Sequence, residues 1–302
     1  MDRKVWRDGA FIPWDDATVS ALAHPMQRGG LVFDVLSFHD TDRGVAAFRL
    51  DAHVARFLRS LSIVGLSSPW DARTLCAATC ATIAATGLRD GLVRISGFVP
   101  TIEADVVPRS PEASVIIAAY ARSEFPKRHV APPCLRIQVP RDLRKAAPDA
   151  IPATAKVAAA YLGPMIARRR ALESGFDEVV LLDHTGHVAE APTANVMAVI
   201  DGALVTPRLG AILDGITRDT LLVLAREESI ATREQALTYE QLSGADEAFI
   251  TATSYLVAPV ASIDGRALRF EAPGPVTTRL KTRFLRLLTG DDPRANEWLT
   301  PV

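Results

Sequence analysis

Short alternating strands joined by tight turns are the feature that most constrains this chain of 302 residues. The opening sequence RKVWRDGAFIPW predicts two strands around Asp8-Gly9, a dipeptide suited to a hairpin turn. Further strands are predicted in GGLVFDVLSFHD, LVRISGFV and ASVIIAAYA, and later in DEVVLLD, NVMAVID, ALVTP and EAFITAT. Few helices separate these strands, which argues against a doubly wound parallel sheet. The sequence therefore predicts an α+β fold.

Helical spacing of apolar residues predicts a small number of helices between the strands. Expected helices cover about 50–66, 71–86 and 156–174, followed by one that begins in LDGITRD and one over 274–290. The charged, proline-interrupted sequence RSEFPKRHVAPP at 122–133 is typical of a connection. We therefore expect a small α+β domain at 1–121, an interdomain linker at 122–133 and a larger β-rich domain at 134–302.

The overall composition favours small-molecule partners. The formal net charge is −1, so the chain creates no field that would gather nucleic acid or anionic lipid. No apolar run reaches membrane-spanning length, and the N-terminus is charged where a secretory signal would be apolar. Three cysteines and six histidines show no metal-ligand spacing, and no metal site is expected. These observations predict a cytoplasmic protein.

Lys156 stands among small residues in ATAKVAAAYL, where an amine has few polar neighbours. A lysine at a helix start usually keeps its amine in solvent. In an apolar site, however, the amine is more often neutral and can add to a carbonyl to form a Schiff base. The small neighbours leave space for a flat group and favour the second interpretation.

Three other segments add candidate groups. Glu190 lies in GHVAEAPTANVMAV, where it is either an exposed loop carboxylate or an acid that keeps a pyridinium nitrogen protonated. In LDGITRDT, Gly215, Ile216 and Thr217 stand at a predicted helix start, which favours an anion such as phosphate. Arg56, on the polar side of its predicted helix, is either a solvated arginine or a countercharge for that phosphate.

Taken together and in this order, these segments resemble the class IV aminotransferases, the pyridoxal phosphate enzymes of fold type IV. The resemblance rests on Arg56, Lys156, Tyr161, Glu190, Asn195 and LDGITRDTLLVLA, and it extends to VWRDGAFIPWDDA and FEAPGPVTTRLKTRFLRLLTG at the two ends. These end segments look most like bacterial branched-chain amino acid aminotransferases. The resemblance implies the two-domain fold of that family, with a large cofactor-binding domain, and a homodimer or higher homo-oligomer.

The resemblance also implies roles for individual residues. Lys156 would form the Schiff base with pyridoxal 5'-phosphate and act as the catalytic acid–base, Tyr161 would bond the phenolic oxygen of the cofactor, and Glu190 would pair with the pyridine nitrogen. The implied cofactor-binding set is completed by Arg56, Asn195, Gly215, Ile216, Thr217 and Thr253. The implied substrate-binding set is Arg28, Phe33, Arg94, Ser254 and Tyr255.

Departures from the family pattern affect the expected substrate. Arg28 and Leu92 stand where branched-chain enzymes have tyrosines, and Ser254 and Tyr255 replace smaller residues in the turn TATSYL. The segments VFDVLSFHD and FRLDAHVARF look closer to (R)-selective amine transaminases. An apolar, branched-chain-like amino acid with a 2-oxo acid acceptor is the first expectation. The alternatives are an (R)-amine or D-amino acid transaminase, a lyase resembling aminodeoxychorismate lyase, and a non-catalytic binding module.

Overall fold

The computed structural model describes residues 3–125 and 133–302, which form two compact units. Within the described residues, the first unit comprises 3–125, 155–159 and 286–302, and the second comprises 133–154 and 160–285. Most of the predicted linker, residues 126–132, lies outside the described residues. The predicted domain division at 122–133 stays a prediction. Each unit is described by itself below.

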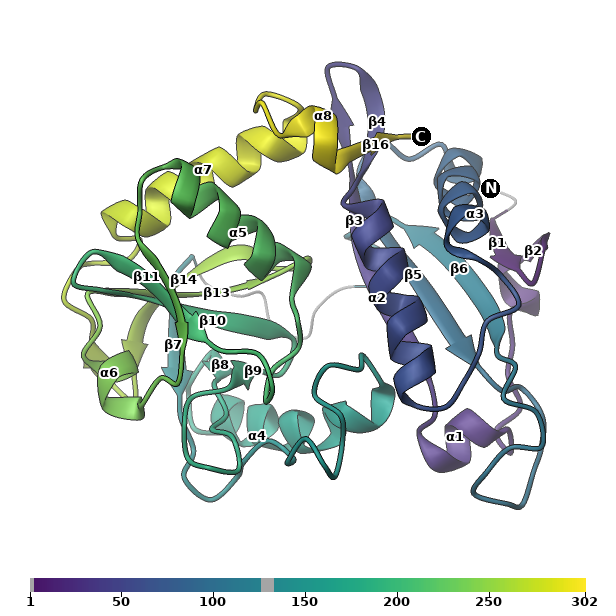
Figure 1. The fold of residues 1–302 in the computed structure, drawn as a ribbon, viewed down its shortest axis with the longest axis horizontal. Coiled ribbons are helices and arrows are strands. Elements are labelled where there is room, and N and C mark those ends of the chain that lie inside the picture. The colour runs from purple at the N-terminus through teal and green to yellow at the C-terminus, as the bar shows by residue number, and fades with distance from the viewer. Residues whose placement is uncertain (1–2, 126–132) are drawn as a thin grey trace. The chain divides into compact units, whose positions relative to one another are not determined.

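An antiparallel sheet of seven strands forms the first unit (Figure 1). Its order is β16-β4-β3-β5-β6-β1-β2, and every pairing in it is antiparallel. The strands are β1 (Lys4–Arg7), β2 (Ala10–Pro13), β3 (Val32–Thr41), β4 (Gly44–Phe48), β5 (Gly91–Phe98), β6 (Ser114–Tyr120) and β16 (Leu299–Pro301). Asp8 and Gly9 both have positive φ between β1 and β2, which confirms the predicted hairpin turn.

Two long helices pack against this sheet, α2 (Leu50–Ile63) on β3 and α3 (Ala72–Thr86) on β6 and β1 (Figure 1). The predicted bounds of α3 are confirmed, because the Asp71 side chain caps its first turn and Gly87 ends it in the left-handed conformation. The short elements of this unit are η1 (Trp14–Asp16), α1 (His24–Arg28) and α8 (Ala295–Trp298). Val54, Phe57 and Leu61 of α2 are buried as the apolar spacing predicts.

A nine-stranded mixed sheet forms the second unit (Figure 1). Its main path is β12-β11-β10-β13-β14-β7-β8, with β9 paired to β10 and β15 paired to β14. The strands are β7 (Leu135–Gln138), β8 (Glu178–Val179), β9 (Glu190–Ala191), β10 (Ala194–Ile200), β11 (Ala203–Pro207), β12 (Thr232–Gln235), β13 (Glu247–Ala252), β14 (Leu256–Ile263) and β15 (Arg266–Ala267). The central pairings are antiparallel, whereas β12, β7 and β8 join in parallel.

Side-chain alternation buries both faces of this central sheet. Val196 and Ala198 of β10 join Ile250 of β13 in one hydrophobic core. The next residues along, Met197 and Phe249, are opposite each other on the other face and are fully buried. Helix α5 (Ile216–Glu227) packs against β13. The strands therefore form a rigid layer that fixes the loops at their ends.

The remaining helices are η2 (Ala158–Tyr161), α4 (Leu162–Glu173), α6 (Tyr239–Ser243) and α7 (Pro275–Thr289). One predicted helix start is wrong. The helix expected over 156–174 does not begin at Lys156, because Val157 instead pairs with Val32 of β3. Hydrogen bonding to the edge of an existing strand outweighs the helix propensity of the surrounding alanines. No helix among the described residues is long and apolar enough to cross a membrane.

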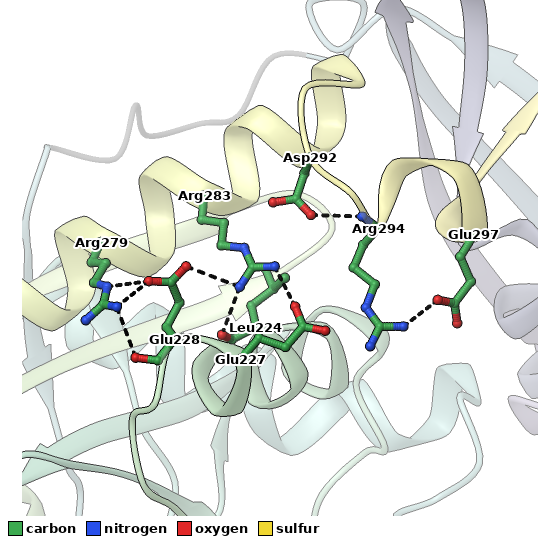
Figure 2. Close-up of polar contacts among 8 residues, drawn as sticks. All are labelled: Leu224, Glu227, Glu228, Arg279, Arg283, Asp292, Arg294 and Glu297. Atoms are coloured by element: carbon green, nitrogen blue, oxygen red, sulfur yellow. Dashed lines mark hydrogen bonds and ion pairs between the residues drawn. The ribbon is translucent and has the colours of Figure 1, made fainter.

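Helix α7 is attached to the C-terminal end of α5 by two arginines (Figure 2). Arg283 donates to Glu227 Oε2 at 2.5 Å and to the Leu224 carbonyl at 3.3 Å, and it lies 3.2 Å from Glu228 Oε1. Arg279 donates to Glu228 Oε2 at 2.5 Å and to the Glu228 carbonyl at 3.0 Å. Farther along the chain, Asp292 and Arg294 form a separate local contact in the same view (Figure 2). Cations at a helix C-terminus satisfy its last carbonyls and complement its dipole.

Replacing Arg283 by methionine tests this attachment. Arg283→Met keeps an unbranched stem but removes the guanidinium, whose side chain is only 14% exposed. We expect a loss of about 1–3 kcal/mol in the free energy of unfolding, because hydrogen bonds to charged groups contribute that much. Urea denaturation measures the change.

Arg286→Met on the same helix is the matched control. Its partner Asp291 is at 2.9 Å, but both side chains are more than half exposed. Exposed ion pairs contribute little, so we expect at most about 1 kcal/mol. Equal losses in the two variants would contradict a specific role for Arg283.

Candidate active site

Lys156 lies in an extended segment that is bonded to β3 of the first unit. Phe33 donates its amide to the Lys156 carbonyl at 3.0 Å, and Ala158 donates to the Leu31 carbonyl at 2.8 Å. The Lys156 amide donates to Ser60 Oγ of α2 at 3.1 Å. Backbone bonds on both sides therefore fix the Cα position of the lysine without a helix.

The side chain of Lys156 lies near an aromatic ring, together with a second cation. Lys156 Nζ is 5.1 Å from the centroid of the Phe33 ring, and the Arg94 guanidinium carbon is 4.8 Å from the same centroid. Phe33 is buried, whereas Arg94 is exposed and Lys156 half-buried. Cations over a ring face are attracted to its quadrupole. The structure thus brings together three of the predicted site residues around one apolar surface with two positive groups.

A buried ion cluster lies under this surface, built from β3 and α2. Asp34 accepts two hydrogen bonds from Arg56, each of 2.8 Å, and lies 2.7 Å from His53 Nδ1. His53 and Arg56 are three residues apart, so they share one face of the helix. Arg56 is only 5% exposed, so its predicted solvated alternative is wrong: the polar face of α2 is turned inward against β3.

The electrostatics of this cluster are set by burial and by the ion pair. Burial alone would raise the pKa of Asp34, but the charges and hydrogen bonds of Arg56 and His53 hold it well below its usual value. Burial lowers the pKa of His53, and the opposing effect of Asp34 is smaller. Asp34 is therefore the charged partner of Arg56, and the arginine is held in one orientation.

In the second unit, Glu190 is the centre of a polar network. Its carboxylate pairs with Lys145 through Oε1, and it accepts hydrogen bonds at Oε2 from Asn195 Nδ2 at 3.0 Å and from the Leu213 amide at 3.1 Å. The side chains of Glu190 and Lys145 are 13% and 11% exposed. The alternative of a loop carboxylate in solvent is therefore wrong for Glu190.

Asn195 connects Glu190 to the start of α5. Besides bonding Glu190, its Nδ2 donates to the Leu213 carbonyl at 3.0 Å. A Cβ placed on Gly215, the N-cap of α5, would be 1.8 Å from Asn195 Oδ1, so only glycine fits there. Ile216 and Thr217 begin the helix and are buried. Their amides belong to the first turn, whose N–H groups have no partner within the helix and suit an anion.

The turn between β13 and β14 carries the remaining residues predicted in this unit. Thr253 is half-buried and Ser254 is exposed. Tyr255 is half-buried, and its hydroxyl donates to Glu178 Oε2 at 2.7 Å.

Tyr161 ends η2 and stands at the N-cap of α4. In the first unit, Arg28 is exposed and donates to the carbonyls of Gln27 and Ala104, at 3.2 and 3.1 Å.

Sequence reasoning did not single out Asp34, His53 or Lys145. A signal existed for the first two: Asp34 is a charge within an apolar strand, and His53 precedes Arg56 by one helical turn. Lys145 lies in an irregular segment, where no periodicity indicates which way a side chain points.

Comparisons with known proteins give one consistent result. A family model described as "Amino-transferase class IV" matches residues 31–263. The chain is 32% identical over 301 residues to a branched-chain-amino-acid aminotransferase of Pseudomonas aeruginosa, covering 100% of this chain and 98% of that protein. It is similar to the crystal structure of a branched-chain aminotransferase from Thermoproteus uzoniensis with norvaline, with a TM-score of 0.92, 32% identity and 99% coverage of both chains. A second branched-chain amino acid aminotransferase, from T.th. and complexed with N-(5'-phosphopyridoxyl)-L-glutamate, gives a TM-score of 0.93 at 30% identity, covering 100% of this chain and 99% of that one.

Replacing Asp34 by asparagine tests the buried cluster. Asp34→Asn keeps the side-chain shape but removes the carboxylate charge that pairs with the buried Arg56 guanidinium. We expect a loss of about 3–5 kcal/mol in the free energy of unfolding at neutral pH, measured by urea denaturation. Asp40→Asn on the same strand is the control, because Asp40 pairs with Arg89 in solvent and exposed pairs contribute little.

The same variant should change the response to acid. Because the pKa of Asp34 is lower in the folded state than in the unfolded chain, its stabilising effect is complete above a pH of about 4 and is lost as the pH falls below it. Below that pH we expect the stability of Asp34→Asn to fall less steeply than that of the wild type. Parallel pH profiles would contradict this account of Asp34.

Proposed function

Because the chain belongs to the class IV aminotransferases, we propose that it transfers an amino group between a branched-chain amino acid and a 2-oxo acid with pyridoxal phosphate as cofactor. The support for the cofactor includes the phosphopyridoxyl group named in the complex of the T.th. enzyme. The support for the substrate is the activity named for the P. aeruginosa relative and the norvaline named in the T. uzoniensis structure. The single observation that carries the proposal is the Glu190 carboxylate, which pairs with Lys145 and is linked through Asn195 to the start of α5.

The residues present fit the proposed cofactor. A carboxylate such as Glu190 suits a protonated pyridine nitrogen, and the amides of Ile216 and Thr217 suit a phosphate. We propose that Lys156 holds the cofactor covalently through Nζ, that Tyr161 bonds its phenolic oxygen, and that Arg56, Asn195, Gly215 and Thr253 complete its binding set. When bound, the cofactor supplies an electron sink that makes the α-proton of an amino acid removable.

Lys156 is the proposed acid–base residue. Its Nζ would take the α-proton of the substrate and return a proton on the cofactor side, where the bound cofactor would supply the electron sink. Two hydrogen bonds hold the backbone that carries this amine: the Lys156 carbonyl accepts from the Phe33 amide, and the Lys156 amide donates to Ser60 Oγ. Lys145, Asn195 and the Leu213 amide contact Glu190 and hold its carboxylate in one position.

We propose that Arg94 binds the substrate carboxylate and that Phe33 contacts its apolar side chain. A guanidinium can bind a carboxylate through two parallel hydrogen bonds, and the adjacent ring favours an aliphatic group. Arg28 bonds two carbonyls next to α1, so we assign it a role only at the substrate entrance. The amine transaminase, D-amino acid transaminase and lyase alternatives are not favoured by the relatives.

A donor panel tests the substrate. Leucine, D-alanine and (R)-1-phenylethylamine are each supplied with 2-oxoglutarate or pyruvate, and conversion of the bound cofactor is followed by its absorbance. We expect conversion with leucine above all. Conversion only with D-alanine or with the amine would overturn the branched-chain assignment, and release of pyruvate without an acceptor would indicate the lyase.

The covalent role of Lys156 is tested by trapping. Protein supplied with pyridoxal phosphate is reduced with borohydride, digested and analysed by mass spectrometry. We expect the added mass on the peptide that contains Lys156, and its absence in Lys156→Ala. Lys145→Ala is the control. The Lys145 amine pairs with Glu190 and should not be labelled, so this variant should keep the added mass on the Lys156 peptide. Labelling elsewhere, or none at all, would remove the basis of the proposal.

We also propose a homodimer, supported by an exposed apolar patch on the first unit. Leu22, Met26, Ile102, Val106 and Val107 are 60–72% exposed. They are brought together because Ala23 pairs with Ile102 and His24 Nε2 bonds the Val106 carbonyl at 2.9 Å. An exposed patch of this kind is typical of an interface.

Light scattering tests the dimer. We expect the wild type at twice the monomer mass, and the double variant Met26→Glu and Val107→Glu at the monomer mass, because a buried charge disfavours association. Leu209→Glu, an equally drastic change on the second unit, should leave the dimer intact. A monomeric wild type would refute the assignment.

A further inference from the structure

A polar network in the second unit ties the turn of Thr253 and Ser254 to elements far away in the sequence. The Tyr255 hydroxyl donates to Glu178 Oε2 of β8 at 2.7 Å and accepts from Arg168 Nη2 of α4 at 3.2 Å. Arg168 Nε is also 3.1 Å from Glu178 Oε1. Three side chains from a turn, a strand and a helix thus contact one another in a closed triangle of two hydrogen bonds and one ion pair.

Burial makes this network strong. The Glu178 side chain is 1% exposed, and its Oε1 also accepts from the Val179 amide at 3.0 Å. Arg168 supplies the countercharge that a buried carboxylate needs. Burial, and then the Glu178 charge, raise the pKa of Tyr255 well above its usual value, so the phenol keeps its proton and acts as the donor. Hydrogen bonds to a buried charge are among the stronger ones in proteins.

The turn needs such an anchor because its backbone is strained. Leu256 has a φ of 56°, in the left-handed region that non-glycine residues avoid. Thr251 Oγ1 donates to the Leu256 carbonyl at 2.6 Å, and Ala252 pairs with Leu256 across the hairpin. These contacts close the base of the turn. The Tyr255 side chain is the contact that reaches from its tip to α4 and β8.

We propose that Tyr255, Glu178 and Arg168 are positioning residues that hold the turn 253–255 in one conformation, so that Thr253 and Ser254 face their anionic ligand preorganised. Tyr255 then contacts no substrate, in contrast to its predicted substrate-binding role, because its hydroxyl is bonded within the protein. The inference rests on the proposed function, in which Thr253 belongs to the cofactor-binding set, and on the predicted substrate-binding role of Ser254. A preorganised turn lowers the entropic cost of binding its ligand.

Hydrogen exchange on the apo protein tests the anchoring without any activity. Tyr255→Phe removes one hydroxyl and keeps the ring. We expect exchange of the amides in a peptide covering 251–257 to accelerate by about tenfold, because a hydrogen bond to a charged group is lost. Tyr239→Phe is the matched control: it removes another hydroxyl of this unit that bonds a carboxylate, that of Asp264, and should leave this peptide unchanged.

A double-mutant cycle shows whether the three residues act as a unit. Arg168→Met should also accelerate exchange of the 251–257 peptide, and the double variant with Tyr255→Phe should add little to either single change. If the acceleration factors of the two single variants multiply in the double variant, the network is not the anchor of the turn. The same holds if exchange is not accelerated in Tyr255→Phe.

Kinetics then connect the anchor to binding. For Tyr255→Phe we expect the KM of leucine and of 2-oxoglutarate to rise together by about fivefold to tenfold with kcat nearly unchanged, since a looser turn weakens binding of both carboxylates alike. If the preference among amino donors changes while amide exchange of the 251–257 peptide does not, Tyr255 is instead a direct substrate contact. Accelerated exchange with unchanged KM overturns the link to binding. A wild type without transaminase activity refutes the proposed function and leaves the exchange result standing.

Discussion

The ion pair of Asp34 with Arg56 is the interaction on which the first unit depends. It places a carboxylate and a guanidinium in a core where neither would be tolerated alone, and it includes His53 from the same helical face. The pair fixes α2 on β3, and α2 in turn offers Ser60 to the backbone of Lys156. A single buried electrostatic contact thus determines both the docking of a helix and the location of the amine.

In the second unit, carboxylates are stabilised by hydrogen bonds and ion pairs with several different groups. Glu190 has a side-chain cation, a side-chain amide and a backbone amide as partners, and Glu178 has an arginine, a phenol and a backbone amide. Each carboxylate therefore has partners on three sides, which fix its position. Glu247 repeats the arrangement at the start of α7, where it accepts from the amides of Val276 and Thr277.

Local patterns in the sequence predict the elements whose causes are local. The hairpin at Asp8-Gly9, the extent of α3 and the start of α5 depend on a few neighbouring residues, and each is confirmed. The predicted start of the helix at Lys156 is wrong because a strand much earlier in the chain competes for the same backbone groups. The partners of Glu190 and Tyr255 are not predictable for the same reason. Lys145 and Arg168 are cationic side chains on irregular or helical surface sequence, and only the tertiary fold directs them inward.

The close fit between Gly215 and Asn195 has a consequence for redesigning this protein. Any side chain at position 215 displaces the side-chain amide of Asn195. Because this amide bonds both Glu190 and the Leu213 carbonyl, one substitution disturbs three residues at once. Libraries that randomise this helix start will therefore lose folded members rather than gain new selectivity. Diversity is better placed at Arg28, an exposed residue whose proposed role lies only at the substrate entrance.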